Sequence, residues 1–223
     1  MKLQTQVLTN TKFRKSVKPP GTAMLKSGKS NKKLGGLIRK GWWKGFPLFS
    51  LTLEERHSCP STCEQWNNCY GNNMPFAHRY DHTHPQFEYT LATNLVQLSQ
   101  KHKQGFVVRL HVLGDFHSEN YVKFWLAMML NIPELRVFGY THHRHNSPIG
   151  TRIANLNDTF PTRWRVRFSD DPNVDFSAHV VASEQLVPPN SGIVCPEQLG
   201  LTESCSDCGY CWHSKKPVYF LEH

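Results

Sequence analysis

The sequence of 223 residues lacks any apolar run near the length of about 18 residues that a membrane helix needs, so we expect no membrane partner. Its first ten residues, MKLQTQVLTN, lack the apolar centre of a secretory signal, so we expect no export. The number of cysteines is seven, which is odd. In a reducing compartment an odd number of thiols argues against a disulfide framework and leaves metal binding or reactive thiols.

Acidic residues are missing from the first 53 positions, which carry 12 Lys and Arg. The whole chain has 26 Lys and Arg against 17 Asp and Glu, so the remainder, with 14 basic and 17 acidic side chains, is slightly acidic. Residues 1–45 are rich in Lys, Gly, Ser and Pro and show no apolar periodicity. This composition predicts a basic N-terminal arm, extended over the body or partly disordered, followed by one domain over residues 46–223.

Nucleic acid is the candidate partner of this arm. Lys and Arg contact phosphates, and the rings of Trp42, Trp43 and Phe46 are able to stack on bases. The alternative is a solvated arm whose aromatic side chains dock on the domain.

Short apolar strands alternate with helical stretches after the arm. Leu91, Leu95 and Leu98 share one face of a helix predicted over residues 86–102. Ser118 is the predicted N-cap of the next helix, and a shorter helix is expected over residues 147–155. Strands are predicted over residues 46–53, 105–113, 135–141, 164–169, 178–182, 192–195 and 218–221. This alternation predicts an α/β fold, and the length fits an incomplete parallel TIM-like barrel of about six strands.

Polar and metal-binding side chains follow six of these strands in succession. In parallel α/β folds the functional site lies at the carboxyl ends of the strands, so we expect a functional face there. The residues are Cys59, Cys63 and Cys69; Gly114, Asp115 and His117; Thr141, His142, His143 and His145; Ser169, Asp170 and Asp171; Ser183 and Glu184; and Cys195.

A cysteine-rich loop near the C-terminus carries the strongest motif. Cys205, Cys208 and Cys211 form a C-x2-C-x2-C run, and Cys195, followed by proline, lies ten residues upstream. Three closely spaced cysteines and a fourth beside proline resemble the ligand set of a bacterial ferredoxin cluster. A zinc site with four cysteines is the main rival, although zinc sites typically use two separated C-x2-C pairs.

A second cysteine group, C-x3-C-x5-C, follows the first strand of the domain at Cys59, Cys63 and Cys69. Its position resembles that of the three cysteines in radical S-adenosylmethionine enzymes, where they hold a 4Fe-4S cluster with one iron open to the cofactor. The usual spacing there is C-x3-C-x2-C. The alternative is a structural zinc site completed by His57, His78, His82 or His84.

The turn Gly114-Asp115 resembles the Gly-Gly-Glu turn of the same enzymes, in which the carboxylate receives the amino group of the cofactor. By this resemblance Gly114 and Asp115 bind S-adenosylmethionine. The histidines of the next loop, His142, His143 and His145, are candidates for metal binding, proton relay or phosphate contact. Asp115, His142 and His143 are the candidate catalytic residues.

Four segments together resemble the phage-encoded family called gene product 88: SLTLEERHSCPSTCEQWNNCYG, VRLHVLGDFHSENYVKFW, FGYTHH and CPEQLGLTESCSDCGYCW. The resemblance covers about residues 46–212. It implies a viral origin, action in the host cytoplasm and a radical-S-adenosylmethionine-like barrel, but no known reaction. By position it points to the two cysteine groups and to the Gly114-Asp115 turn.

We therefore expect an iron–sulfur protein with one 4Fe-4S cluster held by Cys195, Cys205, Cys208 and Cys211. The seven cysteines also allow two clusters, with four and three ligands, and zinc stays the alternative metal. One functional class is an enzyme for redox or radical chemistry on a nucleotide or nucleic acid. The other is a nucleic-acid-binding or regulatory protein with a structural cluster or zinc.

Overall fold

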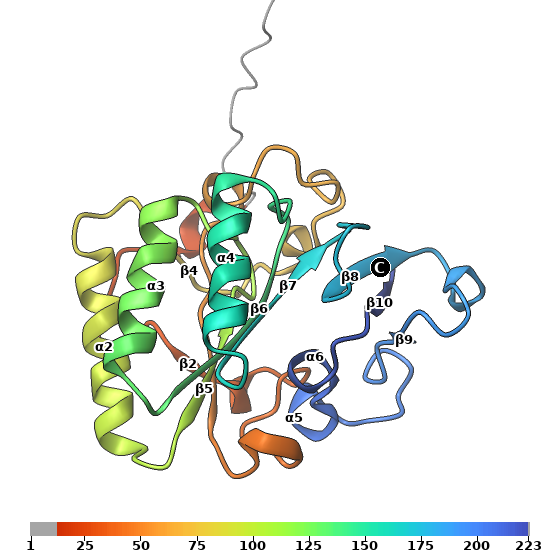
Figure 1. Cartoon of the computed structure of the whole chain (residues 1–223). Helices are drawn as coiled ribbons and strands as arrows, with labels where there is room; N and C mark the ends of the chain where they lie inside the picture. Colours follow the sequence, from red (N-terminus) through yellow and green to blue (C-terminus); the bar gives the residue numbers. More distant parts are fainter. Residues whose placement is uncertain (1–12, 223) are drawn as a thin grey trace, which may run out of the picture.

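The computed structural model describes residues 13–222 (Figure 1). Its centre is an eight-stranded sheet in the order β2-β3-β5-β6-β7-β8-β10-β9. All neighbours in it are parallel except β2 and β3. The strands are β2 (Lys26–Ser27), β3 (Leu48–Ser50), β5 (Phe106–Leu110), β6 (Leu135–Thr141), β7 (Trp164–Ser169), β8 (Ser177–Val181), β9 (Ile193–Val194) and β10 (Val218–Leu221). A small separate sheet pairs β1 (Val17–Lys18) with β4 (Arg79–Tyr80).

The α/β class and the mostly parallel sheet are confirmed, but the described residues form no closed barrel. The two edges of the sheet are β2 and β9. Between β7 and β10 the described chain contains no helix long enough to cover a further strand, only short turns. The final strand, β10, therefore enters between β8 and β9 rather than extending the strand–helix repeat around a barrel.

Helices α2 (Phe87–Lys101), α3 (Glu119–Asn131) and α4 (Pro148–Thr159) lie side by side on one face of the sheet (Figure 1). The predicted N-cap is confirmed, because Ser118 Oγ accepts a hydrogen bond from the Tyr121 amide at 3.1 Å. Ser147 caps α4 in the same way through the Gly150 amide. This helix continues four residues beyond the predicted end at residue 155.

The main core lies between these helices and the sheet. Leu91 and Leu95 of α2 are fully buried in it, whereas Leu98, predicted on the same face, is only partly buried. Strands β5, β6 and β7 contribute alternate apolar residues to the same layer, including Val108, Val137, Val166 and Phe168. This layer fixes the positions of the carboxyl ends of the strands.

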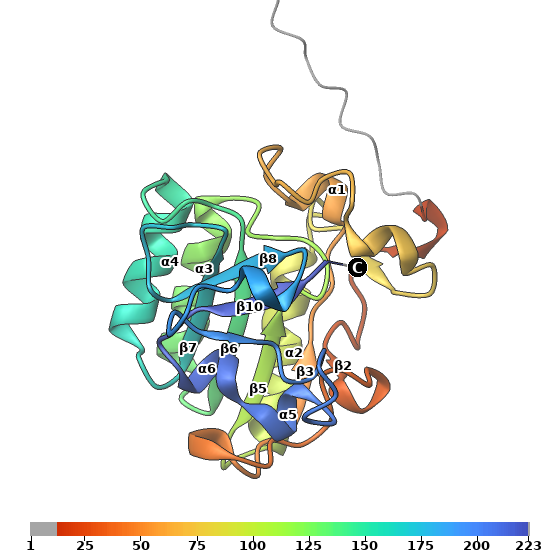
Figure 2. The same cartoon turned by 90° about the vertical axis from the view of Figure 1, so that its right-hand side faces the viewer.

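The opposite face is covered by the N-terminal segment and by the C-terminal helices α5 (Cys205–Cys208) and α6 (Tyr210–His213), which Figure 2 shows in front of the strands. Trp43 and Trp212 stack there with ring centroids 5.4 Å apart. Trp43 Nε1 also donates to the Thr162 carbonyl at 2.8 Å. Part of the predicted arm is thus core: Trp43 docks on the domain, Phe46 is half-buried, and Trp42 stays 59% exposed.

The remaining short elements are α1 (Glu55–Ser58) and the 3-10 helices Arg14–Ser16, Gly28–Ser30, Gly41–Trp43, Tyr70–Asn73 and Glu184–Leu186. No helix in the described part of the chain has the length and apolar character needed to cross a membrane.

Candidate metal centre

The four C-terminal cysteines line one cavity, although ten residues separate the first from the second. Cys195 directly follows β9, Cys205 and Cys208 are the ends of α5, and Cys211 lies in α6. Gly209 has φ of +75° and joins the two short helices in a left-handed turn. A Cβ at this position would lie 2.8 Å from the His213 ring, so the C-x2-C-x2-C turn requires glycine here.

These thiols influence one another electrostatically. Burial raises the pKa of Cys205, and the Cys211 and Cys195 sulfurs raise it further. Burial also raises the pKa of Cys208, with a contribution from Cys195. Releasing the protons of Cys205 and Cys208 therefore needs a strong positive partner. No group of three or more His, Cys, Asp or Glu within residues 13–222 is arranged around a single point as for one metal ion.

Cationic and hydroxyl groups surround the Cys211 side of this cavity. The fully buried Arg167 donates to the carbonyl oxygens of Cys211 at 3.0 Å, Ser214 at 2.7 Å and Lys216 at 2.9 Å. The Tyr140 hydroxyl donates to Cys211 Sγ at 2.8 Å. Arg109 lies 4.5 Å from the centre of the Tyr140 ring. The positive charge of Arg109 lowers the pKa of Cys205 against the larger effect of burial.

The basic N-terminal segment holds the cysteine loop in place through its backbone. The Cys205 amide donates to the Lys33 carbonyl at 2.7 Å, and the Ser206 amide donates to the Leu34 carbonyl at 3.0 Å. In return the Arg39 amide donates to the Ser206 carbonyl at 2.9 Å. This role of the N-terminal segment was not predicted from the sequence. The sequence feature that could have indicated it is the spacing of Leu34 and Ile38, which are both buried.

The first cysteine group lies in acidic surroundings. Burial raises the pKa of Cys63 to about 11, and Asp115 contributes in the same direction. The pKa of Cys59 is raised by burial, then by Asp115, and then by the other two thiols of the group, Cys63 and Cys69. The structure therefore brings this group together with Asp115, at the edge where the sequence places a functional face.

Arg79 organises the loop that carries this group. Its side chain is fully buried, and its guanidinium lies 2.8 Å and 3.3 Å from the two Glu55 carboxylate oxygens. The remaining donors bind acceptors spread along the loop and the N-terminal segment. These are the carbonyls of Gly71, Met74 and Ala77 at 2.9–3.0 Å and the Ser16 hydroxyl at 3.0 Å.

The Gly114-Asp115 turn is sterically specified. Gly114 has φ of +90°, and a Cβ there would lie 2.5 Å from Ser58 Oγ. The Asp115 carboxylate is buried, with Oδ1 accepting from the Phe116 amide and Oδ2 from the His142 amide, both at 2.7 Å. In this structure the carboxylate therefore joins the ends of β5 and β6.

The predicted histidine loop extends along the same edge. His143 Nε2 lies 2.7 Å from the Phe116 carbonyl. His145 binds Asp171 Oδ2 through both its amide and Nδ1 at 2.9 Å. Burial of Asp171 opposes ionisation, but these hydrogen bonds lower its pKa to about 2. The histidines are thus oriented by backbone and carboxylate contacts.

A stack of histidines that sequence reasoning did not group lies beside α3. The His82 and His117 rings are 4.1 Å apart, and the His111 Nε2 atom is 3.0 Å from the Tyr121 hydroxyl. Burial, followed by the proximity of His82, lowers the pKa of His117 to about 3, so this imidazole is neutral at physiological pH. His82, a candidate ligand for zinc, is therefore placed against His117.

The sequence model of the gene product 88 family matches residues 16–214. This span includes both cysteine groups, the Gly114-Asp115 turn and most of the basic segment. No curated protein and no solved structure matches the chain. The resemblance noted in the sequence is confirmed, and the chain belongs to the gene product 88 family.

Proposed function

We propose that this member of the gene product 88 family is an iron–sulfur protein that holds one 4Fe-4S cluster on Cys195, Cys205, Cys208 and Cys211. The observation that carries the proposal is that these four thiols line one cavity despite their separation in the sequence. Four cysteine thiolates are the usual ligand set of such a cluster. A reducible cluster supplies one-electron chemistry when bound.

Positive charges beside the cavity would balance thiolates held by a metal centre, whereas burial by itself raises the pKa of Cys195, Cys205 and Cys208. Arg167 is fully buried, yet no ion pair found among residues 13–222 includes it. A buried charge without a counter-charge is costly, and thiolates held by a metal centre would balance it. Lys33, which is paired with Glu197, lowers the pKa of Cys195 and Cys205 against the larger effect of burial.

The neighbouring side chains have defined tasks in this proposal. The stacked Trp43 and Trp212 rings, both buried, exclude water from the floor of the site. The Tyr140 hydroxyl donates to Cys211 Sγ and stabilises negative charge on that sulfur. Arg167 fixes the backbone of α6 through the carbonyl of Cys211 within the helix and that of Ser214 directly after it.

The test compares two single substitutions in protein that is purified anaerobically. We expect the unsubstituted chain to be brown and to contain about four iron and four sulfide per chain. Cys208→Ala should lose most of this iron, whereas the matched substitution Cys63→Ala, in the other cysteine group, should keep it. Equal loss of iron in both variants would indicate two clusters. A colourless sample that contains only zinc would refute the proposal and favour the structural zinc alternative.

A second candidate is radical chemistry at the first cysteine group, with S-adenosylmethionine as cofactor. The mutual electrostatic influence of Cys59, Cys63 and Cys69, next to Asp115, favours it. In this candidate function Gly114 and Asp115 would bind S-adenosylmethionine, and His142 and His143 would lie at the edge of the cofactor site. The test is reductive cleavage of S-adenosylmethionine by fully reconstituted protein. No cleavage above the level of Cys63→Ala would exclude this candidate.

A further inference from the structure

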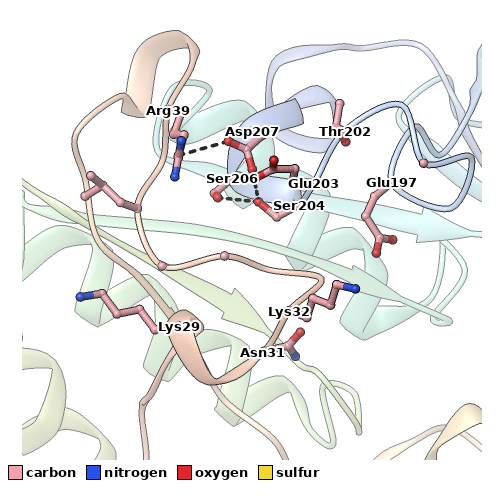
Figure 3. A pocket seen from close by; sticks show the side chains of 14 residues that line it. Lys29, Asn31, Lys32, Arg39, Glu197, Thr202, Glu203, Ser204, Ser206 and Asp207 are labelled. Carbon is pink, nitrogen blue, oxygen red and sulfur yellow. Dashed lines mark hydrogen bonds and ion pairs between the residues drawn. The ribbon is translucent and has the colours of Figure 1, made fainter.

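A cavity of about 790 Å³ lies between the N-terminal segment and the C-terminal cysteine loop (Figure 3). Residues 29–39 form one wall of it, and residues 197–207 form the other. Ligand pockets commonly measure about 300–1,000 Å³, so the cavity is large enough for a nucleotide unit. It adjoins the cavity lined by the four thiols, because Glu197 lines both, but none of the four cysteines lines it.

The acidic wall of this cavity is largely neutralised within the protein. Glu197 Oε2 lies 3.1 Å from Lys33 Nζ. Asp207 Oδ1 lies 3.2 Å from Arg39 Nε, and its other oxygen accepts a hydrogen bond from the Ser204 hydroxyl, as Figure 3 shows. Glu203 is left as the single acidic side chain of the cavity that has no ion pair within residues 13–222.

The opposite wall carries two lysines whose charge is balanced by no carboxylate among the described residues. Lys29 and Lys32 are exposed and take part in no ion pair among the described residues. Between them and the acidic wall, Gly35 has φ of +74°, and a Cβ there would lie 2.1 Å from Ser206 Oγ. The two walls are therefore held in direct contact at Gly35, which fixes the position of the lysines relative to the serine hydroxyls.

We propose that this cavity binds the phosphate groups of a single-stranded nucleic acid. Exposed ammonium groups without carboxylate partners among the described residues are suited to phosphate oxygens. A nucleic-acid strand is favoured over a free nucleotide because Trp42 is 59% exposed and follows Arg39 by three residues. An aromatic ring on which a base could stack therefore lies on the same segment. The proposal concerns charges outside the thiol cavity and does not rest on the identity of the metal.

The test measures binding of a fluorescent oligothymidylate of about 12 nucleotides to the full-length protein by anisotropy at several salt concentrations. The variant is Lys29→Gln/Lys32→Gln, and the matched control is Lys101→Gln/Lys103→Gln, which removes the same charge from two exposed lysines at the end of α2. Melting temperature and metal content are compared in all samples, so that loss of folding or of a cluster is detected separately.

The expected change follows from the release of counterions. Each phosphate contact to a single strand contributes about 0.7 to the slope of log affinity against log salt, so losing two contacts makes the slope shallower by about 1.4. Extrapolated from 1 M to 50 mM salt, this difference weakens binding roughly sixty-fold. The control should keep the original slope. Glu203→Gln should bind more tightly, because it removes the free carboxylate of the cavity.

Two results would overturn the proposal: no oligonucleotide binding by the unsubstituted protein, or equal affinity and slope for the variant and the control. Adding ATP distinguishes a nucleic-acid strand from a free nucleotide as the ligand that supplies the phosphate groups. Weak competition by ATP supports a strand as the ligand. If ATP alone binds, and binds through Lys29 and Lys32, a free nucleotide is the ligand and the strand is excluded. Trp42→Ala should weaken oligonucleotide binding without changing the salt slope.

Discussion

Replacing Arg79 by Met should lower the free energy of unfolding by about 3–5 kcal/mol, the range seen when one partner of a buried ion pair is removed. Arg79 is fully buried, and Glu55 is 2% exposed. The substitution leaves the Glu55 carboxylate in the interior without the guanidinium that lies 2.8 Å away. It also removes the donors to the Gly71, Met74 and Ala77 carbonyls, which are spread along the first cysteine loop.

The assay is urea unfolding followed by circular dichroism, combined with limited proteolysis of residues 59–78. In a double-mutant cycle, Arg79→Met/Glu55→Met should be less destabilised than the sum of the two single variants, because the double variant buries neither of the two opposite charges. The coupling energy should reach the upper part of the usual range, about 2–3 kcal/mol. The loop of Arg79→Met should be cut faster by protease than the loop of the unsubstituted protein.

Arg152→Met is the matched control for this cycle. Arg152 Nε lies 2.6 Å from Glu119 Oε2, but both side chains are 43% exposed. An exposed pair of this kind contributes about 0–1 kcal/mol. If Arg79→Met costs no more than Arg152→Met, or if the two substitutions of the cycle are additive, then the buried guanidinium does not organise the first cysteine loop.

Three further predictions follow from single contacts. Tyr140→Phe removes the hydroxyl that donates to Cys211 Sγ, so a potentiometric titration of the reconstituted protein should give a lower reduction potential at unchanged iron content. Gly114→Ala places a side chain at φ of +90° and should cost more than about 1 kcal/mol in urea unfolding. Asp171 has its pKa lowered from 3.8 to about 2 beside His145, so its contribution to stability is present above pH 3.8 and is lost as the pH falls toward 2. Asp171→Asn should lack this loss when unfolding is measured from pH 5 to pH 2.

Strands with strong local patterns could be predicted from the sequence with correct bounds. The predicted strands over residues 135–141, 164–169 and 218–221 are β6, β7 and β10. Their β-branched and aromatic residues are flanked by turns or helix starts, so the local signal is sufficient. The order of the strands in the sheet could not be predicted in this way. The place of β10 between β8 and β9 depends on contacts between distant segments, which no local pattern encodes.

The amino-acid composition of the N-terminal segment does not indicate which of its residues are buried. Its lysines and glycines predict an extended arm, yet Met24, Leu34, Ile38 and Trp43 are buried. Four apolar side chains spread over twenty residues produce no regular periodicity. Met24 belongs to the main core, whereas Leu34, Ile38 and Trp43 belong to the cluster that includes Trp212. Deleting the segment would consequently remove core residues as well as charge, so substitutions such as Lys29→Gln are the cleaner test of nucleic-acid binding.

The two cysteine groups differ in the charges that lie beside individual thiols. Asp115 raises the pKa of Cys59 and Cys63, so the first group resists ionisation. Arg109 and Lys33 act in the opposite direction on Cys205. Burial is the largest cause in both groups, because it raises the pKa of Cys205 as well as those of Cys59 and Cys63. Binding a cluster requires the thiolate form, so either group should bind metal more readily as the pH rises. The amino group of a cofactor bound at Asp115 would offset the effect of this carboxylate on the pKa of Cys59 and Cys63.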